Sequence, residues 1–154
     1  MNADQVLPQV VVGSYPEDTR DIDRLKRDFK ITAVLNLHTD EDIDDLNIPW
    51  ATIQEHYRRS GIELRRVPVR DFDGEDLQAH LPECVRALGE LIDDGQTVYC
   101  HCTAGMGRSP SVVVAYLHWV EQWDLDEAAG HVHECRPCSP DIQAIRLAGE
   151  DFSA

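Results

Sequence analysis

The segment at residues 101–109 constrains the fold of this chain more than any other, and it reads His-Cys-Thr-Ala-Gly-Met-Gly-Arg-Ser. It lies between a short apolar run at residues 97–100 and a longer one at residues 112–120. This order predicts a strand, a tight glycine-containing loop and a helix. At such a junction the backbone N–H groups and the helix dipole attract an anion. The sequence therefore predicts an anion-binding loop within an α/β protein.

Two side chains of this loop have the chemistry to act on a phosphate ester. Cys102 opens the loop, where the surrounding N–H dipoles favour the nucleophilic thiolate. Arg108 closes it, and a guanidinium holds two phosphate oxygens at once. The intervening residues are uncharged, and their backbone N–H groups are predicted to bind the remaining phosphate oxygens. They are Thr103, Ala104, Gly105, Met106 and Gly107.

The predicted reaction transfers the phosphoryl group to Cys102 and then to water. We expect the hydroxyl of Ser109 to lie near the sulfur and to stabilise the thiolate when water cleaves the intermediate. His101 is predicted to support the loop through backbone hydrogen bonds and to help keep the Cys102 thiolate ionised. Because the loop supplies the positive field, the sequence predicts no metal and no cofactor.

The rest of the chain alternates between apolar strand patterns and amphipathic helix patterns, which predicts a three-layer α/β sandwich with a mainly parallel central sheet. Its length of 154 residues fits one domain spanning residues 1–154, with no carbohydrate-binding module. Strands are expected at residues 10–13, 31–37, 62–69 and 97–100. Helices are expected at residues 16–29, 51–59, 75–94 and 110–122, with two more beyond residue 124, and an acidic loop is expected at residues 40–45.

Composition limits the partners and the compartment. The formal net charge of −15 argues against nucleic acid and anionic membrane surfaces. No basic segment followed by an apolar run begins the chain, so we expect a cytoplasmic, monomeric protein whose thiolate stays reduced. Cys135 and Cys138 have the spacing of a metal-binding or redox pair, but no second pair of ligands accompanies them.

The loop and several other segments resemble one family. The Cys-x5-Arg loop is similar to that of the cysteine-dependent phosphatases of the dual-specificity type, and within these it resembles the glucan phosphatases. Five further segments carry the resemblance, at residues 10–14, 31–37, 70–73, 81–82 and 138–146.

The resemblance implies a general acid upstream of the nucleophile. The match at Arg70-Asp71-Phe72-Asp73 implies Asp71, with Asp73 as the alternative. The acid protonates the leaving oxygen and later accepts a proton from water. Asn36, at the end of a buried strand, is expected either to bond the backbone of the phosphate loop or to serve only as a turn residue.

Two substrate classes follow from the resemblance. The first is a phosphorylated α-glucan, which would require exposed aromatic platforms near the loop. Phe72, Asp73 and Trp50 are the candidate substrate-binding residues, although Trp50 could equally be a packing residue. The alternative is a phosphoprotein carrying phosphotyrosine, phosphoserine or phosphothreonine.

Overall fold

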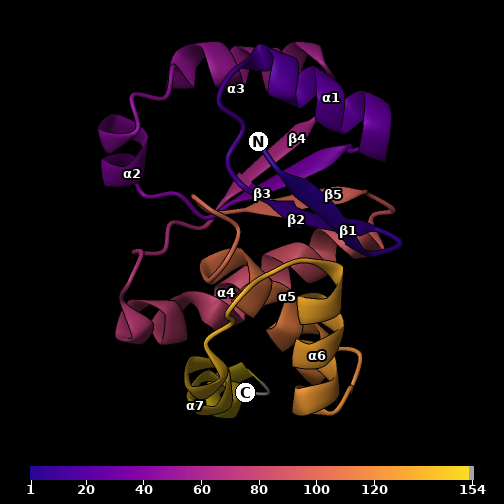
Figure 1. Cartoon of the computed structure of the whole chain (residues 1–154), viewed down its shortest axis with the longest axis vertical. Helices are drawn as coiled ribbons and strands as arrows, with labels where there is room; N and C mark the ends of the chain where they lie inside the picture. The colour runs from indigo at the N-terminus through magenta and orange to yellow at the C-terminus, as the bar shows by residue number, and fades with distance from the viewer. Residues whose placement is uncertain (153–154) are drawn as a thin grey trace.

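Within residues 1–152, which the computed structural model describes, a five-stranded sheet lies between two layers of helices (Figure 1). The strands are β1 (Ala3–Leu7), β2 (Val10–Gly13), β3 (Ala33–Asn36), β4 (Glu63–Arg66) and β5 (Val98–His101). The helices are α1 (Thr19–Phe29), α2 (Asp40–Asp45), α3 (Trp50–Arg59), α4 (Gly74–Asp93), α5 (Arg108–Trp119), α6 (Leu125–Cys135) and α7 (Ile142–Phe152). This arrangement confirms the predicted α/β sandwich.

The sheet is parallel except at one edge. Its order is β1-β2-β5-β3-β4, and only β1 runs antiparallel, to β2. The protein has two hydrophobic cores, one on each face of the sheet. The side chains of successive residues on the central strands point alternately into one core and the other, because side chains alternate between the faces of a sheet. On β5, Val98 and Cys100 enter one core and Tyr99 the other. The strand sequences are therefore almost continuously apolar, as is typical of a sheet that is covered on both faces.

The two helical layers differ in size. Helices α1 and α3 cover one face, whereas α4, α5, α6 and α7 cover the other (Figure 1). The smaller core contains Ile22 and Leu25 from α1 and Tyr57 from α3. No helix of the described part of the chain combines the length and apolar character needed to cross a membrane.

The carboxyl ends of the parallel strands meet at one edge. Gly13, His101 and Asn36 are register partners on adjacent strands, and Arg66 follows on β4. The loops that leave these strands therefore start side by side, and ligands of α/β proteins bind at this edge. The phosphate loop leaves β5, which lies between β2 and β3.

Two local predictions were wrong. Residues 40–45 form α2 instead of an acidic loop, because Thr39 and Asp42 make a reciprocal capping box around a short turn with little apolar content. The edge strand β1 is missing from the predicted set, because only Val6 of its five residues is buried. The other elements lie where expected, with ends that differ by a few residues.

Candidate active site

The phosphate loop at residues 102–107 curls tightly against the end of β2. Gly105 has φ +70, and a Cβ added there would lie 2.5 Å from the carbonyl carbon of Gly13. Both the left-handed backbone and the close approach therefore require glycine at this position. The buried Arg136 supports the loop from behind: its Nε donates to the Gly105 carbonyl at 2.9 Å, and its Nη1 donates to the Val12 carbonyl at 2.9 Å.

Cys102 contributes to a pocket of about 550 Å³ at the end of the central strand. The residue is only 3% exposed, and its Sγ lies 3.3 Å from the Oγ of Ser109. The structure thus places this hydroxyl beside the predicted nucleophile. The pocket is lined by Arg70, Asp71, Phe72, Asp73, Gly74, Leu77, Cys102, Ala104, Met106, Gly107, Arg108, Ser139 and Asp141.

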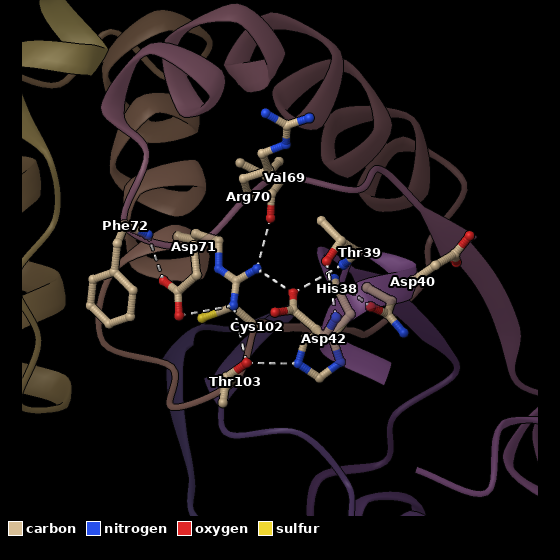
Figure 2. Close-up of polar contacts among 12 residues, drawn as sticks. His38, Thr39, Asp40, Asp42, Val69, Arg70, Asp71, Phe72, Cys102 and Thr103 are labelled. Carbon is tan, nitrogen blue, oxygen red and sulfur yellow. Dashed lines mark hydrogen bonds and ion pairs between the residues drawn. The ribbon is translucent and has the colours of Figure 1, made fainter. Parts of the chain in front are cut away.

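Arg108 is 3% exposed and is held by groups from three separate segments. Its Nη1 donates to Asp42 Oδ2 at 2.8 Å and to the Val69 carbonyl at 2.7 Å. Its Nη2 donates to Thr103 Oγ1 at 3.0 Å and lies 3.4 Å from Asp71 Oδ2. These groups converge next to Cys102 (Figure 2).

The two candidate acids, Asp71 and Asp73, make different contacts. The carboxylate of Asp71 points toward Cys102 (Figure 2), its Oδ1 accepts a hydrogen bond from the Phe72 N–H, and its side chain is 36% exposed. The side chain of Asp73 caps α4 by accepting from the Asp76 N–H at 3.0 Å. Both residues line the pocket, and the geometry favours Asp71 as the acid because Asp73 has a capping role.

The predicted substrate-binding residues do not all reach the pocket. Phe72 is fully exposed at its mouth and has a φ of 55, which is uncommon for an aromatic residue and marks local strain. Trp50 does not line this pocket: it packs against the smaller core, and the guanidinium of Arg66 lies 5.1 Å from its ring centroid. Trp50 is therefore a packing residue, because α3 starts on the opposite face of the sheet.

Behind the loop lie two buried histidines. His38 Nε2 and Thr103 Oγ1 are 3.0 Å apart, and His101 Nδ1 donates to the Cys102 carbonyl at 3.0 Å. Asn36 accepts from the His38 N–H through its Oδ1 at 2.7 Å, so the predicted bond from Asn36 to the phosphate loop is replaced by one to His38. Sequence reasoning missed His38 and Asp42; the Thr39-x-x-Asp42 spacing of a capping box is the signal that could have found Asp42.

Both histidines are neutral in the folded protein at pH 7. Burial lowers the pKa of His38 to about 4, with Arg108 and Arg66 contributing and Asp42 opposing. Burial likewise lowers the pKa of His101 to about 3. His101 therefore supports the loop as a hydrogen-bond donor. Because it is neutral, it adds no positive charge beside Cys102, so the expectation that it helps keep the thiolate ionised is corrected.

These pKa values predict a loss of stability in mild acid. Unfolding returns each histidine to a pKa near 6.5, so the unfolded state binds more protons below that pH. The contribution of the two neutral histidines to the free energy of unfolding is complete above pH 6.5. It falls progressively as the pH decreases toward their pKa values in the folded protein. For each histidine, the free energy of unfolding should be lower at pH 5 than at pH 7 by about 2 kcal/mol. Urea unfolding at both pH values measures this loss, and His38→Gln should roughly halve it; an equal loss in that variant would contradict the prediction.

No group of three or more His, Cys, Asp or Glu side chains in residues 1–152 is arranged to hold a metal ion. Cys135 and Cys138 are free, and the carbonyl of Cys138 lies 3.2 Å from His133 Nδ1. The segment that contains them also secures the phosphate loop, because the Ser139 N–H donates to the Met106 carbonyl at 2.7 Å.

Comparison with known proteins agrees with this architecture. Residues 11–146 match the family model described as the dual specificity phosphatase catalytic domain. A phosphoglucan phosphatase from Castanea sativa, DSP4, is 33% identical over 99% of this chain and 41% of its own length. Laforin from Mus musculus is 31% identical over 99% of this chain and 50% of its own length. The chain thus spans half the length or less of these relatives.

Solved structures share the fold over almost the whole chain. The crystal structure of PTPMT1 superposes with a TM-score of 0.78 and 24% identity, covering 99% of this chain and 94% of that one. The active form of Tk-PTP superposes with a TM-score of 0.75 and 27% identity, covering 97% and 95% of the two chains. The matched family model, the fold and the phosphate loop with its buried arginine together establish that this chain belongs to the dual-specificity phosphatase family.

Proposed function

We propose that this domain hydrolyses phosphomonoesters carried on an α-glucan. The observation that carries the proposal is the pocket itself: a buried cysteine in a phosphate loop, a buried arginine beside it, and an exposed aromatic ring at the mouth. The cysteine and the arginine can carry out phosphoryl transfer, and the aromatic ring offers an apolar face on which a sugar ring can stack.

The reaction proceeds in two displacements. The thiolate of Cys102 attacks phosphorus, the bond from phosphorus to the leaving oxygen breaks, and Asp71 gives that oxygen its proton. Water then attacks phosphorus, Asp71 accepts a proton from it, and the sulfur–phosphorus bond breaks. Ser109, whose Oγ lies 3.3 Å from Sγ, donates a hydrogen bond to the departing thiolate. The loop N–H groups and Arg108 stabilise the charge on the phosphate oxygens.

The surroundings of the pocket support a neutral leaving group. A second hollow of about 490 Å³ adjoins the pocket and shares Phe72, Asp73, Gly74 and Asp141 with it. Its remaining walls are Glu75, Gln78, Gln143, Ala144 and Leu147, so neither lysine nor arginine is among the described residues that line it. Amides, carboxylates and apolar faces suit the hydroxyls and ring faces of a sugar chain better than they suit a polyanion.

The names of two relatives, phosphoglucan phosphatase DSP4 and phosphoglucan phosphatase LSF1, support the same substrate class. Other relatives are named dual specificity protein phosphatases, including one from Mus musculus at 27% identity. Phosphoproteins are therefore the competing substrate that an experiment must exclude.

The test compares phosphate release from phosphorylated amylopectin with hydrolysis of para-nitrophenyl phosphate. We expect Phe72→Ala to lower the ratio of the two activities roughly tenfold, because an aromatic stacking contact contributes about 1.5 kcal/mol. Val120→Ala removes another exposed apolar side chain, one that does not line the pocket, and should leave the ratio unchanged. Negligible release from amylopectin, with strong activity on phosphopeptides, would assign the protein to the phosphoprotein class.

We further propose a monomeric, cytoplasmic enzyme that binds neither nucleic acid nor membrane. The net charge of −15 supports the absence of polyanionic partners. Five free cysteines, including the predicted nucleophile, support a reducing compartment.

A further inference from the structure

Each backbone carbonyl of the phosphate loop, residues 102–107, accepts a hydrogen bond from a group outside the loop. In chain order of the carbonyls, the donors are His101 Nδ1, the Tyr15 N–H, Arg136 Nη2, Arg136 Nε, the Ser139 N–H and the Ser111 N–H, at 3.0, 3.1, 3.3, 2.9, 2.7 and 3.0 Å. The carbonyls of the loop therefore all point away from the anion site.

These contacts fix the direction of the loop N–H groups. The peptide bonds of the described residues are all trans, and in a planar trans peptide the C=O and the N–H of the following residue point in opposite directions. Because the carbonyls of residues 102–107 point outward to their donors, the N–H groups of residues 103–108 point inward. In the described part of the chain none of these N–H groups donates to a backbone carbonyl, so they remain available to an anion.

Arg136 holds two consecutive peptide groups of the loop. Its Nη2 donates to the Ala104 carbonyl and its Nε donates to the Gly105 carbonyl. These two contacts set the direction of the N–H groups of Gly105 and Met106. Both peptide groups lie in the middle of the loop, between the end of β5 and the start of α5, where neither element holds the backbone.

The guanidinium of Arg136 is in turn held by β2 and by the N-terminal residues that include β1. Its Nη1 donates to Asp4 Oδ2 at 3.1 Å and to the Val12 carbonyl at 2.9 Å, and its Nη2 donates to Asn2 Oδ1 at 2.6 Å. Arg136 is 4% exposed, whereas the side chain of Asp4 is 44% exposed. Each nitrogen of this buried guanidinium therefore has a protein acceptor, and Asp4 supplies its counter-charge.

We propose that Arg136 is a positioning residue of the phosphatase reaction. It turns the N–H groups of Gly105 and Met106 toward the bound phosphate, and Asp4 holds it in the orientation that does so. Among the described residues that line the pocket Arg136 is absent, so it acts through the loop backbone and does not touch the phosphate. The proposal rests on the proposed phosphatase activity and does not depend on whether the substrate is a glucan.

Two substitutions distinguish positioning from simple electrostatics. Arg136 is a positive charge near an anion site, so electrostatics alone predicts that Arg136→Lys keeps phosphate binding and that Asp4→Ala strengthens it. Positioning predicts weaker binding in both variants. A single ammonium nitrogen cannot replace a planar fork that reaches the loop, β1 and β2 at once, and without Asp4 the guanidinium loses one partner of Nη1. Asp4→Asn keeps an oxygen acceptor and should preserve the orientation.

The experiment compares Arg136→Lys, Asp4→Ala, Asp4→Asn and Glu134→Ala. Glu134 is an exposed carboxylate on α6, close to Arg136 in the chain and outside the pocket, so Glu134→Ala is a control for loss of charge. The measurements are kcat/KM for para-nitrophenyl phosphate, the dissociation constant of inorganic phosphate, and the midpoint of thermal unfolding. In addition, NMR records the shifts of the amide protons of residues 103–108 at saturating phosphate.

We expect Arg136→Lys to lose about ten- to a hundredfold in kcat/KM, somewhat less than the roughly 10²–10³ that removal of one oxyanion donor costs. Its phosphate binding should weaken by a comparable factor. Asp4→Ala should bind phosphate roughly two- to fivefold more weakly, the effect of a partly exposed ion pair. Asp4→Asn and Glu134→Ala should match the unsubstituted protein.

The amide protons report the orientation directly. Phosphate should shift the amide protons of Gly105 and Met106 downfield in the unsubstituted protein. In Arg136→Lys these two shifts should shrink, whereas those of Thr103 and Arg108, whose preceding carbonyls have other donors, should persist.

Three results would overturn the proposal. The first is unchanged phosphate affinity in Arg136→Lys, and the second is tighter phosphate binding by Asp4→Ala. The third is an equal loss of the phosphate-induced shift at every loop amide with a lowered unfolding midpoint, which would show a purely structural role. If Arg136→Lys does not fold, the partly exposed Asp4 still provides the test through the sign of the change in affinity.

Failure of the proposed function is read separately. Absence of turnover by the unsubstituted protein would refute the phosphatase assignment, whereas the phosphate titrations and the amide shifts would still decide whether Arg136 orients the loop.

Discussion

Cys102→Ser is expected to abolish turnover while leaving a folded protein that still binds phosphate. The loop N–H groups, Arg108 and the support from Arg136 do not involve the sulfur, so the anion site should persist. A serine hydroxyl is a weak nucleophile unless a general base activates it, and the neighbouring His101 side chain donates to the Cys102 carbonyl. We expect a loss on the order of 10⁴–10⁶ in kcat, as for removal of other catalytic nucleophiles.

The measurement pairs turnover of para-nitrophenyl phosphate with titration of inorganic phosphate. Cys135→Ser is the matched control, because Cys135 is a partly exposed free cysteine that does not line the pocket, and it should retain full activity. A Cys102→Ser protein that keeps more than a few per cent of turnover would show that another group attacks phosphorus.

Asp71→Ala is expected to lower the rate by about 10²–10⁴ with a poor leaving group, the usual size of general acid catalysis. The loss should shrink for a good leaving group, because a phenolate that departs without a proton needs no acid. Asp73→Ala should behave differently: it removes the N-cap of α4 and should cost about 1 kcal/mol of stability without dependence on the leaving group.

The test is the slope of the rate against leaving-group pKa for a series of aryl and alkyl phosphates. Asp71→Ala should show a steeper slope than the unsubstituted protein, and Asp73→Ala should run parallel to it. The reverse pattern would transfer the acid role to Asp73. Unfolding in urea then separates the capping contribution of Asp73 from any catalytic one.

Much of the fold could be predicted because the pattern that specifies it is local. The strands β2, β3 and β5 are short apolar runs bounded by turn residues, and their side chains alternate between two cores. The phosphate loop was predictable because a cysteine, two glycines and an arginine lie within seven residues of one another, at the point where an apolar strand gives way to a helix. Helix α2 was missed because its order comes from a capping box and only Ile43 is buried.

The tertiary structure alone decided which distant residues surround the loop. The contacts of Asp42 and Val69 with Arg108, and of Arg136 with Gly105, join residues far apart in the chain. They depend on the order of the strands and on where each connecting segment leaves the edge of the sheet, which the sequence does not show directly. Trp50 lies outside the candidate site for the same reason: it belongs to α3, which covers the face of the sheet where the smaller core lies. The sequence by itself determined the class of fold and the position of the phosphate loop with its candidate nucleophile, because each depends on neighbouring residues. The folded sheet decided how the arginine is oriented, which aromatic ring reaches the pocket, and that both supporting histidines are neutral, because orientation and burial arise only when separate segments pack together.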